Sequence, residues 1–336
     1  MVDVQGRALC SHAVWGRRCR WGKCCEFSHD VPPELAACLR DKARAQTEAA
    51  LVRRVEEAPD VEVPGWLREL QARPCIFEFD TQKWPLREAA EAALEVRQGS
   101  SLEELHLRAL EGEPPTCPVL LEAFGTVLGR TNLPLAWAAA SEAAGADRAA
   151  TLRTAWRSDA HRRFLQLYDA FVAEVLAPAL CPGGAVLAQR PPCVRVHLSG
   201  QRAAKGKIGM HKDSDYPGHC EAEINFWVPL TCVGGANSLY VESAPGLGDF
   251  TPLEMEYGQV YRFYGYGCRH HTMANETAST RVSFDTRLAP ADCCPEAALR
   301  GPRRGARGMR IGDYGAARYE AVQSRASEAG CDDGIL

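Results

Sequence analysis

The sequence predicts an α+β fold, a double-sheet jelly roll backed by helices. Helical patterns dominate the chain before Pro182, and short alternating segments dominate the chain after it. The composition fits such a domain, because hydrophobic residues make up 46% of the 336 residues and charged residues 24%. A chain of this length can bury one large core or two modest ones.

The first half of the chain has mainly helical patterns. Ala, Leu, Arg and Glu fill residues 34–57 without Gly or Pro, and apolar residues recur at helical spacing in 158–176. The latter helix is amphipathic and needs a partner surface. Shorter helices are expected at 86–97 and 102–111, the second beginning with a capping box from Ser101 to Glu104, with a linker at 59–64 and a strand at 75–79.

The segments after Pro182 alternate between apolar and polar residues and end at Gly, Pro, Asn or Asp, which is typical of strands. In the segment 223–230, Glu223 and Asn225 alternate with apolar residues. The polar pair would therefore face a cavity and the apolar residues the helices. Strands are expected at 194–198, 223–230, 238–241, 259–264 and 280–286.

Fifteen cysteines are many for a chain of this size, and no secretory signal pattern precedes them. No run of 18 apolar residues occurs either, so no membrane span is expected. We therefore expect an intracellular protein, cytoplasmic or nuclear, whose cysteines are metal ligands or small buried hydrophobes. The net charge of −4 says nothing about nucleic acid, but basic residues gather near both ends and could contact phosphate.

Near the N-terminus, Cys10, Cys19, Cys25 and His29 follow the spacing C-x8-C-x5-C-x3-H. Three thiolates and one imidazole can close a tetrahedral structural Zn(II) site. Cys24 could replace Cys25, although both flanking intervals would then be atypical. The spacing resembles that of CCCH zinc fingers, many of which bind single-stranded RNA. Three aromatic residues stand beside basic ones here, which suits base stacking, and contact with a protein is the alternative.

A second constellation lies in the strand-rich region. His211 and Asp213 stand two residues apart, so on an extended chain they point to the same side. A second histidine is available at His270 or His271. Two imidazoles and one carboxylate form the facial triad of non-haem Fe(II) oxygenases. Asp215 and His219 are expected to be solvated loop residues.

The segment after the second histidine predicts a cosubstrate site. Arg281, Ser283, Asp285 and Arg287 alternate with Val282, Phe284 and Thr286, so one strand face is polar. A polar face inside a barrel requires a ligand. The planar guanidinium of Arg281 suits a carboxylate, and Ser283 adds a hydroxyl. Together they would bind the distal carboxylate of 2-oxoglutarate, with Asn225 as a further cavity residue that contributes to the same site.

The run from Pro192 to Pro290 resembles the streptomycin-biosynthesis hydroxylase-like branch of the phytanoyl-CoA-type dioxygenases. The matching pieces are VRVHLSG, HKDSDY, EINFWVPLT, NSLYVES, GDF, CRHHTMANET and TRVSFDTR. The resemblance implies a double-stranded β-helix that uses Fe(II), 2-oxoglutarate and O2. By position it implies iron ligation by His211, Asp213 and His270, which stands eleven residues before the 2-oxoglutarate arginine, Arg281. The presence of Asp213 argues against a halogenase.

We therefore predict an Fe(II)- and 2-oxoglutarate-dependent hydroxylase that oxidises a C–H bond and releases succinate and CO2. Its substrate would be a small molecule, or RNA or an RNA-bound protein tethered by the finger. The alternative is an RNA-binding adaptor with a non-catalytic jelly roll. The expected organisation is a zinc finger at 1–32, a helical region with a short strand at 33–150, the oxygenase domain with its supporting helix at 151–295 and a basic extension at 296–336.

Overall fold

The chain divides into two compact units, Met1–Asp60 and Val61–Leu336. The computed structural model describes only residues of the second unit: 62–110, 121, 124, 126–128, 154–200, 208–216, 219–294 and 318–325. The expected zinc ligands and the expected helix at 34–57 lie outside the described residues. No helix in the described part of the chain is long and apolar enough to cross a bilayer.

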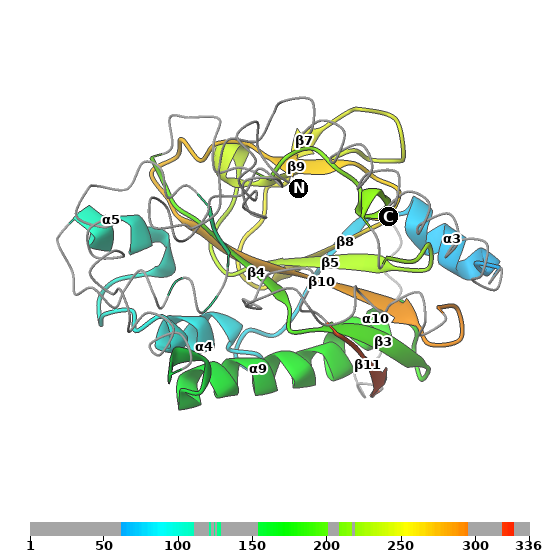
Figure 1. The fold of residues 1–336 in the computed structure, drawn as a ribbon, viewed down its shortest axis with the longest axis horizontal. Helices are drawn as coiled ribbons and strands as arrows, with labels where there is room; N and C mark the ends of the chain where they lie inside the picture. The colour runs from blue at the N-terminus through cyan, green and yellow to red at the C-terminus, as the bar shows by residue number, and fades with distance from the viewer. Residues whose placement is uncertain are drawn as a thin grey trace, which may run out of the picture. The chain divides into compact units, whose positions relative to one another are not determined.

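An eight-stranded sheet forms the centre of the second unit (Figure 1). Its longest strand, β10, pairs along one edge with β5 and along the other with β4 and then β3. All pairs are antiparallel except that of β2 with β4. The strands are β1 (Cys75–Glu78), β2 (Thr126–Leu128), β3 (Ala185–Arg190), β4 (Cys193–His197), β5 (Ile224–Pro229), β8 (Gln259–Phe263), β10 (Arg281–Pro290) and β11 (Arg318–Gln323).

A smaller sheet has the order β7-β6-β9, formed by Thr251–Pro252, Leu239–Val241 and His270–Thr272. A bridge between His211 and His270 adds a further segment to its edge. The chain passes from β4 to the bridge, to β5, to β6 and β7, to β8, to β9 and to β10, so it alternates between the two sheets. This alternation is the connectivity of a double-sheet jelly roll. The predicted α+β class with antiparallel sheets is confirmed.

Helices cover the face of the large sheet that is turned away from the small sheet (Figure 1). The main one, α9 (Asp159–Phe171), begins at Ser158, whose hydroxyl accepts a hydrogen bond from the His161 amide. It continues through a π-helical turn, η4 (Val172–Leu176), into α10 (Ala177–Leu180). This continuous helical run includes the helix predicted at 158–176. Further helices in the described part of the chain are α3 (Gly65–Ala72), α4 (Leu86–Ala93), η2 (Leu102–Glu104) and α5 (Leu105–Leu110).

The π-helical turn explains how β11 is attached. The Ala177 amide donates to Val172, and Pro178 has no amide hydrogen. In an α-helix the carbonyl of Ala173 would accept a hydrogen bond from the amide of residue 177, and in a π-helix from that of residue 178. The first amide donates elsewhere and the second has no hydrogen, so this carbonyl has no donor within the helix. It accepts instead from the amide of Arg325, 3.0 Å away, directly after β11. The strand thus joins the large sheet beside β3 and is also tied to the helix.

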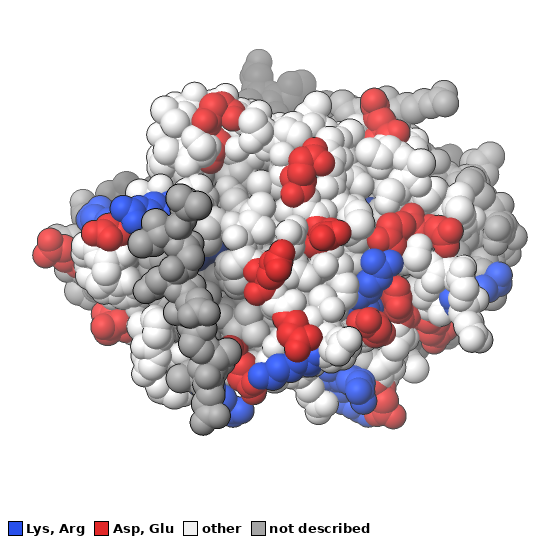
Figure 2. Space-filling view, turned by 180° about the vertical axis from the view of Figure 1, so that it is seen from behind, with Lys and Arg blue, Asp and Glu red and all other residues white. Residues whose placement is uncertain are grey.

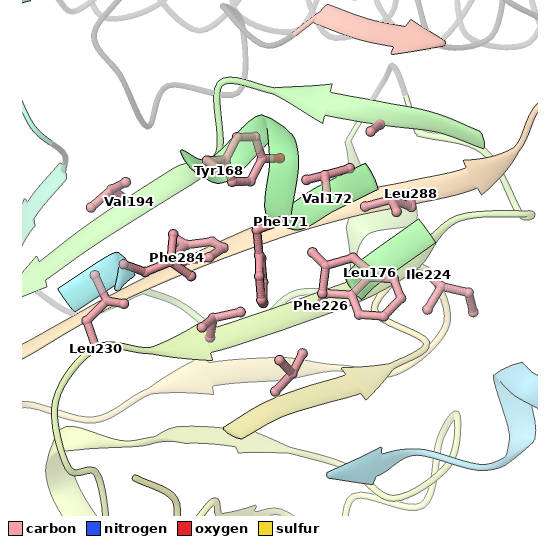
Figure 3. Close-up of a cluster of buried hydrophobic side chains, with 14 of the residues drawn as sticks. Tyr168, Phe171, Val172, Leu176, Val194, Ile224, Phe226, Leu230, Phe284 and Leu288 are labelled. Atoms are coloured by element: carbon pink, nitrogen blue, oxygen red, sulfur yellow. The ribbon is translucent and has the colours of Figure 1, made fainter. Parts of the chain in front are cut away.

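The core lies between α9 and the large sheet, where aromatic rings meet edge to face (Figure 3). Phe284 of β10 has its ring centroid 5.8 Å from that of Tyr168 and 6.4 Å from that of Phe164. Phe226 of β5 projects to the same side. Because side chains alternate along a strand, these apolar residues leave the polar residues of β5 and β10 to face the small sheet.

Two cysteines differ from expectation. Cys220 and Cys294 form a disulfide, so the expectation that cysteines are metal ligands or small buried hydrophobes is wrong for this pair. They are 74 positions apart in the sequence. They meet because Cys220 precedes β5 and Cys294 follows β10, and the start of β5 pairs with the end of β10.

The surface carries charges of both signs. Figure 2 shows acidic side chains spread over the face seen from behind, with most basic side chains beside acidic ones. Among the described residues visible there, no continuous basic patch covers this face.

We predict that Phe284→Ala lowers the free energy of unfolding by about 3–5 kcal/mol, because it leaves a cavity beneath two aromatic rings. Phe284→Leu fills most of that space and should cost clearly less. Urea denaturation followed by tryptophan fluorescence measures both. Equal costs for the two variants would contradict the packing described for this core.

Candidate active site

The cavity between the two sheets brings three predicted ligands together. His211 is held against β9 by two backbone hydrogen bonds to His270, of 3.1 and 2.8 Å. Asp213 begins the short helix η5 (Asp213–Asp215), and its amide donates to the carbonyl of Gly265 at 2.9 Å. The Nε2 atoms of His211 and His270 lie 3.9 and 3.8 Å from Oδ1 of Asp213. One metal ion could contact all three ligand atoms, which lie within 4.8 Å of one another.

The two imidazoles are oriented for metal binding. Nδ1 of His211 lies 2.8 Å from the carbonyl oxygen of Gly209, and Nδ1 of His270 lies 3.1 Å from that of Cys268. A carbonyl only accepts, so each Nδ1 carries the hydrogen and each Nε2 directs its lone pair towards Asp213. Burial lowers the pKa of His270, which favours the neutral form that a metal requires.

The carboxylate of Asp213 is fully buried and heavily hydrogen-bonded. Its Oδ2 accepts from Asn225 Nδ2 and from Arg287 Nε, both at 2.7 Å, and its Oδ1 accepts from Arg287 Nη2 at 3.1 Å. Burial acts to raise the pKa of Asp213, but Arg287 and His270 outweigh it and hold this pKa well below its usual range. Asp213 is therefore held as an ionised carboxylate, the form that a metal ion would bind. The donor set, one carboxylate and two imidazoles, fits Fe(II).

Arg281 lies in the same cavity, which its side chain lines together with His211, His270 and Trp227. Its Nη1 donates to the carbonyl of Asn237 at 2.8 Å, whereas Nε has no hydrogen-bond partner among the described residues. No carboxylate in the described part of the chain forms an ion pair with it. Burial and the neighbouring Arg195 lower the pKa of Arg281 to about 9. A buried cation with spare donors is suited to bind an anion.

The two other residues expected to bind the cosubstrate occupy different surroundings. Ser283 lies on the cavity face of β10, fully buried, and its hydroxyl has no partner among the described residues. Asn225 donates to Asp213, and its side-chain oxygen accepts from the Gly265 amide at 3.1 Å. In this structure Asn225 therefore supports the metal-binding carboxylate. Its contact with a cosubstrate stays a prediction.

His271 is on the other side of β9 from His270. Its ring stacks on that of Tyr240 at 5.2 Å between centroids and meets Phe250 edge to face at 5.0 Å. Neighbouring residues of a strand face opposite ways, so only His270 reaches Asp213.

Sequence reasoning missed two features of the site. His219 was expected to be solvated, but its side chain is only 7% exposed and Nδ1 lies 2.7 Å from Oε2 of Glu223. A sequence gives no signal for such a pair across a turn. The contact of Arg287 with Asp213 was also not foreseen. The sequence did contain a signal for it. Arg281 and Arg287 are six residues apart on one strand, and an even spacing places both side chains on the cavity face.

No protein-family model matches the sequence. The streptomycin biosynthesis protein StrG of Streptomyces griseus is 36% identical over 154 residues, which are 44% of this chain and 70% of StrG. Two similar solved structures are the non-heme monooxygenase ThoJ in a nickel complex and the α-ketoglutarate-dependent carbocyclase SnoK from nogalamycin biosynthesis. Each is 16% identical with a TM-score of 0.32. They cover 52% and 39% of this chain, and 69% and 62% of their own.

We predict that His270→Ala abolishes the charge-transfer absorption band formed by Fe(II) and 2-oxoglutarate without oxygen, because one of three protein ligands is lost. His271→Ala is the matched control and should keep the band, since its ring packs on Tyr240. Anaerobic titration followed by visible absorption measures both variants. Loss of the band only in His271→Ala would reverse the assignment of the ligand.

Proposed function

Since the chain belongs to the family of the streptomycin biosynthesis protein StrG, we propose that it is an Fe(II)- and 2-oxoglutarate-dependent dioxygenase. The observation that carries the proposal is the presence of His211, Asp213, His270 and a buried arginine in one cavity. Three protein ligands leave coordination positions open for a cosubstrate and O2.

The proposed reaction hydroxylates a C–H bond. One atom of O2 enters the substrate as a hydroxyl group, and the other enters succinate as 2-oxoglutarate loses CO2. The bound metal would supply the site at which the cosubstrate and O2 react. The protein would supply the fixed ligand geometry, the seat for the cosubstrate and a cavity that limits access of water.

The charges in the cavity suit a dianionic cosubstrate. Arg195, Arg281 and Arg287 are buried, and the carboxylates among them are Asp213 and Asp285. Asp213 pairs with Arg287, and Asp285 lies close to both Arg195 and Arg287. Of the three guanidiniums, Arg281 is the one without a carboxylate partner among the described residues, so it is the group best placed to bind the distal carboxylate of 2-oxoglutarate, with Ser283 beside it.

The rival proposal is an adaptor whose jelly roll has no turnover. An adaptor has no need of a buried carboxylate beside two imidazoles, and this favours the enzyme. Formation of succinate from 2-oxoglutarate by the purified, iron-loaded protein decides between them. The two proposed substrate classes are a small molecule and an RNA or RNA-bound protein.

We predict that Arg281→Leu raises the concentration of 2-oxoglutarate required for half-maximal turnover by about 10- to 100-fold, because a charge-assisted contact is lost. The affinity for Fe(II) should change much less, since Arg281 does not contact Asp213. Uncoupled succinate formation at varied 2-oxoglutarate measures the effect. An unaltered requirement would show that the cosubstrate is held elsewhere.

We further propose that Cys10, Cys19, Cys25 and His29 bind one structural Zn(II), which would order a short segment for contact with single-stranded RNA or a protein. Deletion of residues 1–30 would then reduce activity on a macromolecular substrate but not on a small one.

We predict that Cys19→Ser removes about one equivalent of zinc per chain, because a structural site needs all four ligands. Cys232→Ser is the matched control, since Cys232 is an exposed free thiol of the second unit. Metal analysis of purified protein measures both variants. Equal zinc content in the two variants would exclude the assignment.

A further inference from the structure

We infer that Arg287 is a positioning residue of the metal centre, which fixes the Asp213 carboxylate so that one oxygen alone is presented to the ion. The inference rests on the proposed function, because it assumes that His211, Asp213 and His270 bind the metal. It assigns a task to a buried arginine distinct from that of the cosubstrate arginine, Arg281.

The hydrogen bonds of Asp213 leave room for a single metal contact. An ionised carboxylate has about four acceptor positions, two on each oxygen. Asn225 and Arg287 Nε occupy both positions on Oδ2, and Arg287 Nη2 occupies one on Oδ1. The remaining position is on Oδ1, the oxygen that lies 3.8 and 3.9 Å from the two imidazole Nε2 atoms. Asp213 can therefore bind a metal ion through Oδ1 alone, as a monodentate ligand.

Arg287 can fix this geometry because it is itself held on its other side. Nη1 donates to Oε1 of Gln189 at 3.0 Å and to Oδ2 of Asp285 at 2.9 Å, and the residue is only 1% exposed. Arg287 and Asn225 are also directly opposite each other on β10 and β5. The register of two paired strands therefore sets the two donors to Asp213 side by side. Both donors therefore come from strands of the large sheet.

The same count argues against a second ion beside the first. Asp213, His219 and Glu223 also form a group with metal-binding atoms within 4.8 Å. Both positions on Oδ2 of Asp213 are already taken, and the open position on Oδ1 faces the two imidazoles. The geometry therefore supports one ion, at His211, Asp213 and His270.

The test measures binding of Co(II), a probe that does not react with O2 as Fe(II) does, to metal-free full-length protein. Arg287→Met should weaken Co(II) binding by about 10- to 100-fold, the usual effect of losing a partner that orients a ligand. Arg281→Met is the matched control, because it removes an equally buried arginine from the same face of β10. It should change the Co(II) dissociation constant much less than Arg287→Met does, because no hydrogen bond joins Arg281 to Asp213 among the described residues, while weakening 2-oxoglutarate binding.

Arg287→Lys distinguishes a role in orienting Asp213 from a role in the stability of the fold alone. Lysine keeps the charge but cannot donate from two fixed nitrogens to both oxygens. We expect this variant to unfold at a urea concentration near that of the wild type, yet to show an altered Co(II) visible spectrum, because Asp213 can then bind through both oxygens. The lysine variant keeps the test valid even where Arg287→Met does not fold.

Wild-type Co(II) affinity and spectrum in folded Arg287→Lys would overturn the inference. Failure of the proposed function looks different. In that case Co(II) binding to the wild-type protein would be unaffected by His270→Ala, and no succinate would form.

Discussion

The ionised carboxylate of Asp213 has no contact with solvent, and such a charge is unstable in a protein interior unless it is paired and hydrogen-bonded. Arg287 and Asn225 meet this requirement, and each comes from a strand of the large sheet. The rest of the site follows from this constraint. The two imidazoles approach the only oxygen position left open, and the carbonyl groups of Gly209 and Cys268 fix the hydrogen on the far nitrogen of each ring.

The long strand β10 links this site to the core. Val282, Phe284 and Leu288 face α9 and its neighbours, whereas Arg281, Ser283 and Arg287 face the cavity. The apolar face packs against the helix and fixes the strand in place. The paired strands then fix the positions of the polar side chains on the other face, as a metal site requires. Stability and chemistry thus use alternate residues of the same strand.

The sequence predicted the features that local patterns encode. Alternation located the strands around Val194, Phe226 and Phe284, and helical spacing located the helix that carries Tyr168. His211 and Asp213 were foreseen because a spacing of two defines their common side. The contacts that the sequence could not predict depend on which distant segments become neighbours. The pairing of β11 with β3, the disulfide between Cys220 and Cys294 and the His219–Glu223 hydrogen bond all belong to this class.

Arg281 and Arg287 show why residue type and spacing alone do not assign roles. Both are 1% exposed, and both are on the cavity face of β10. They differ in what the neighbouring strands place beside them. Arg287 lies opposite Asn225 and reaches two aspartates, so its donors are committed to the protein. Arg281 reaches a single backbone carbonyl and keeps an unused donor, so it can bind a ligand. The proposed division between holding the metal ligand and receiving the cosubstrate therefore comes from the positions of carboxylates along the strand.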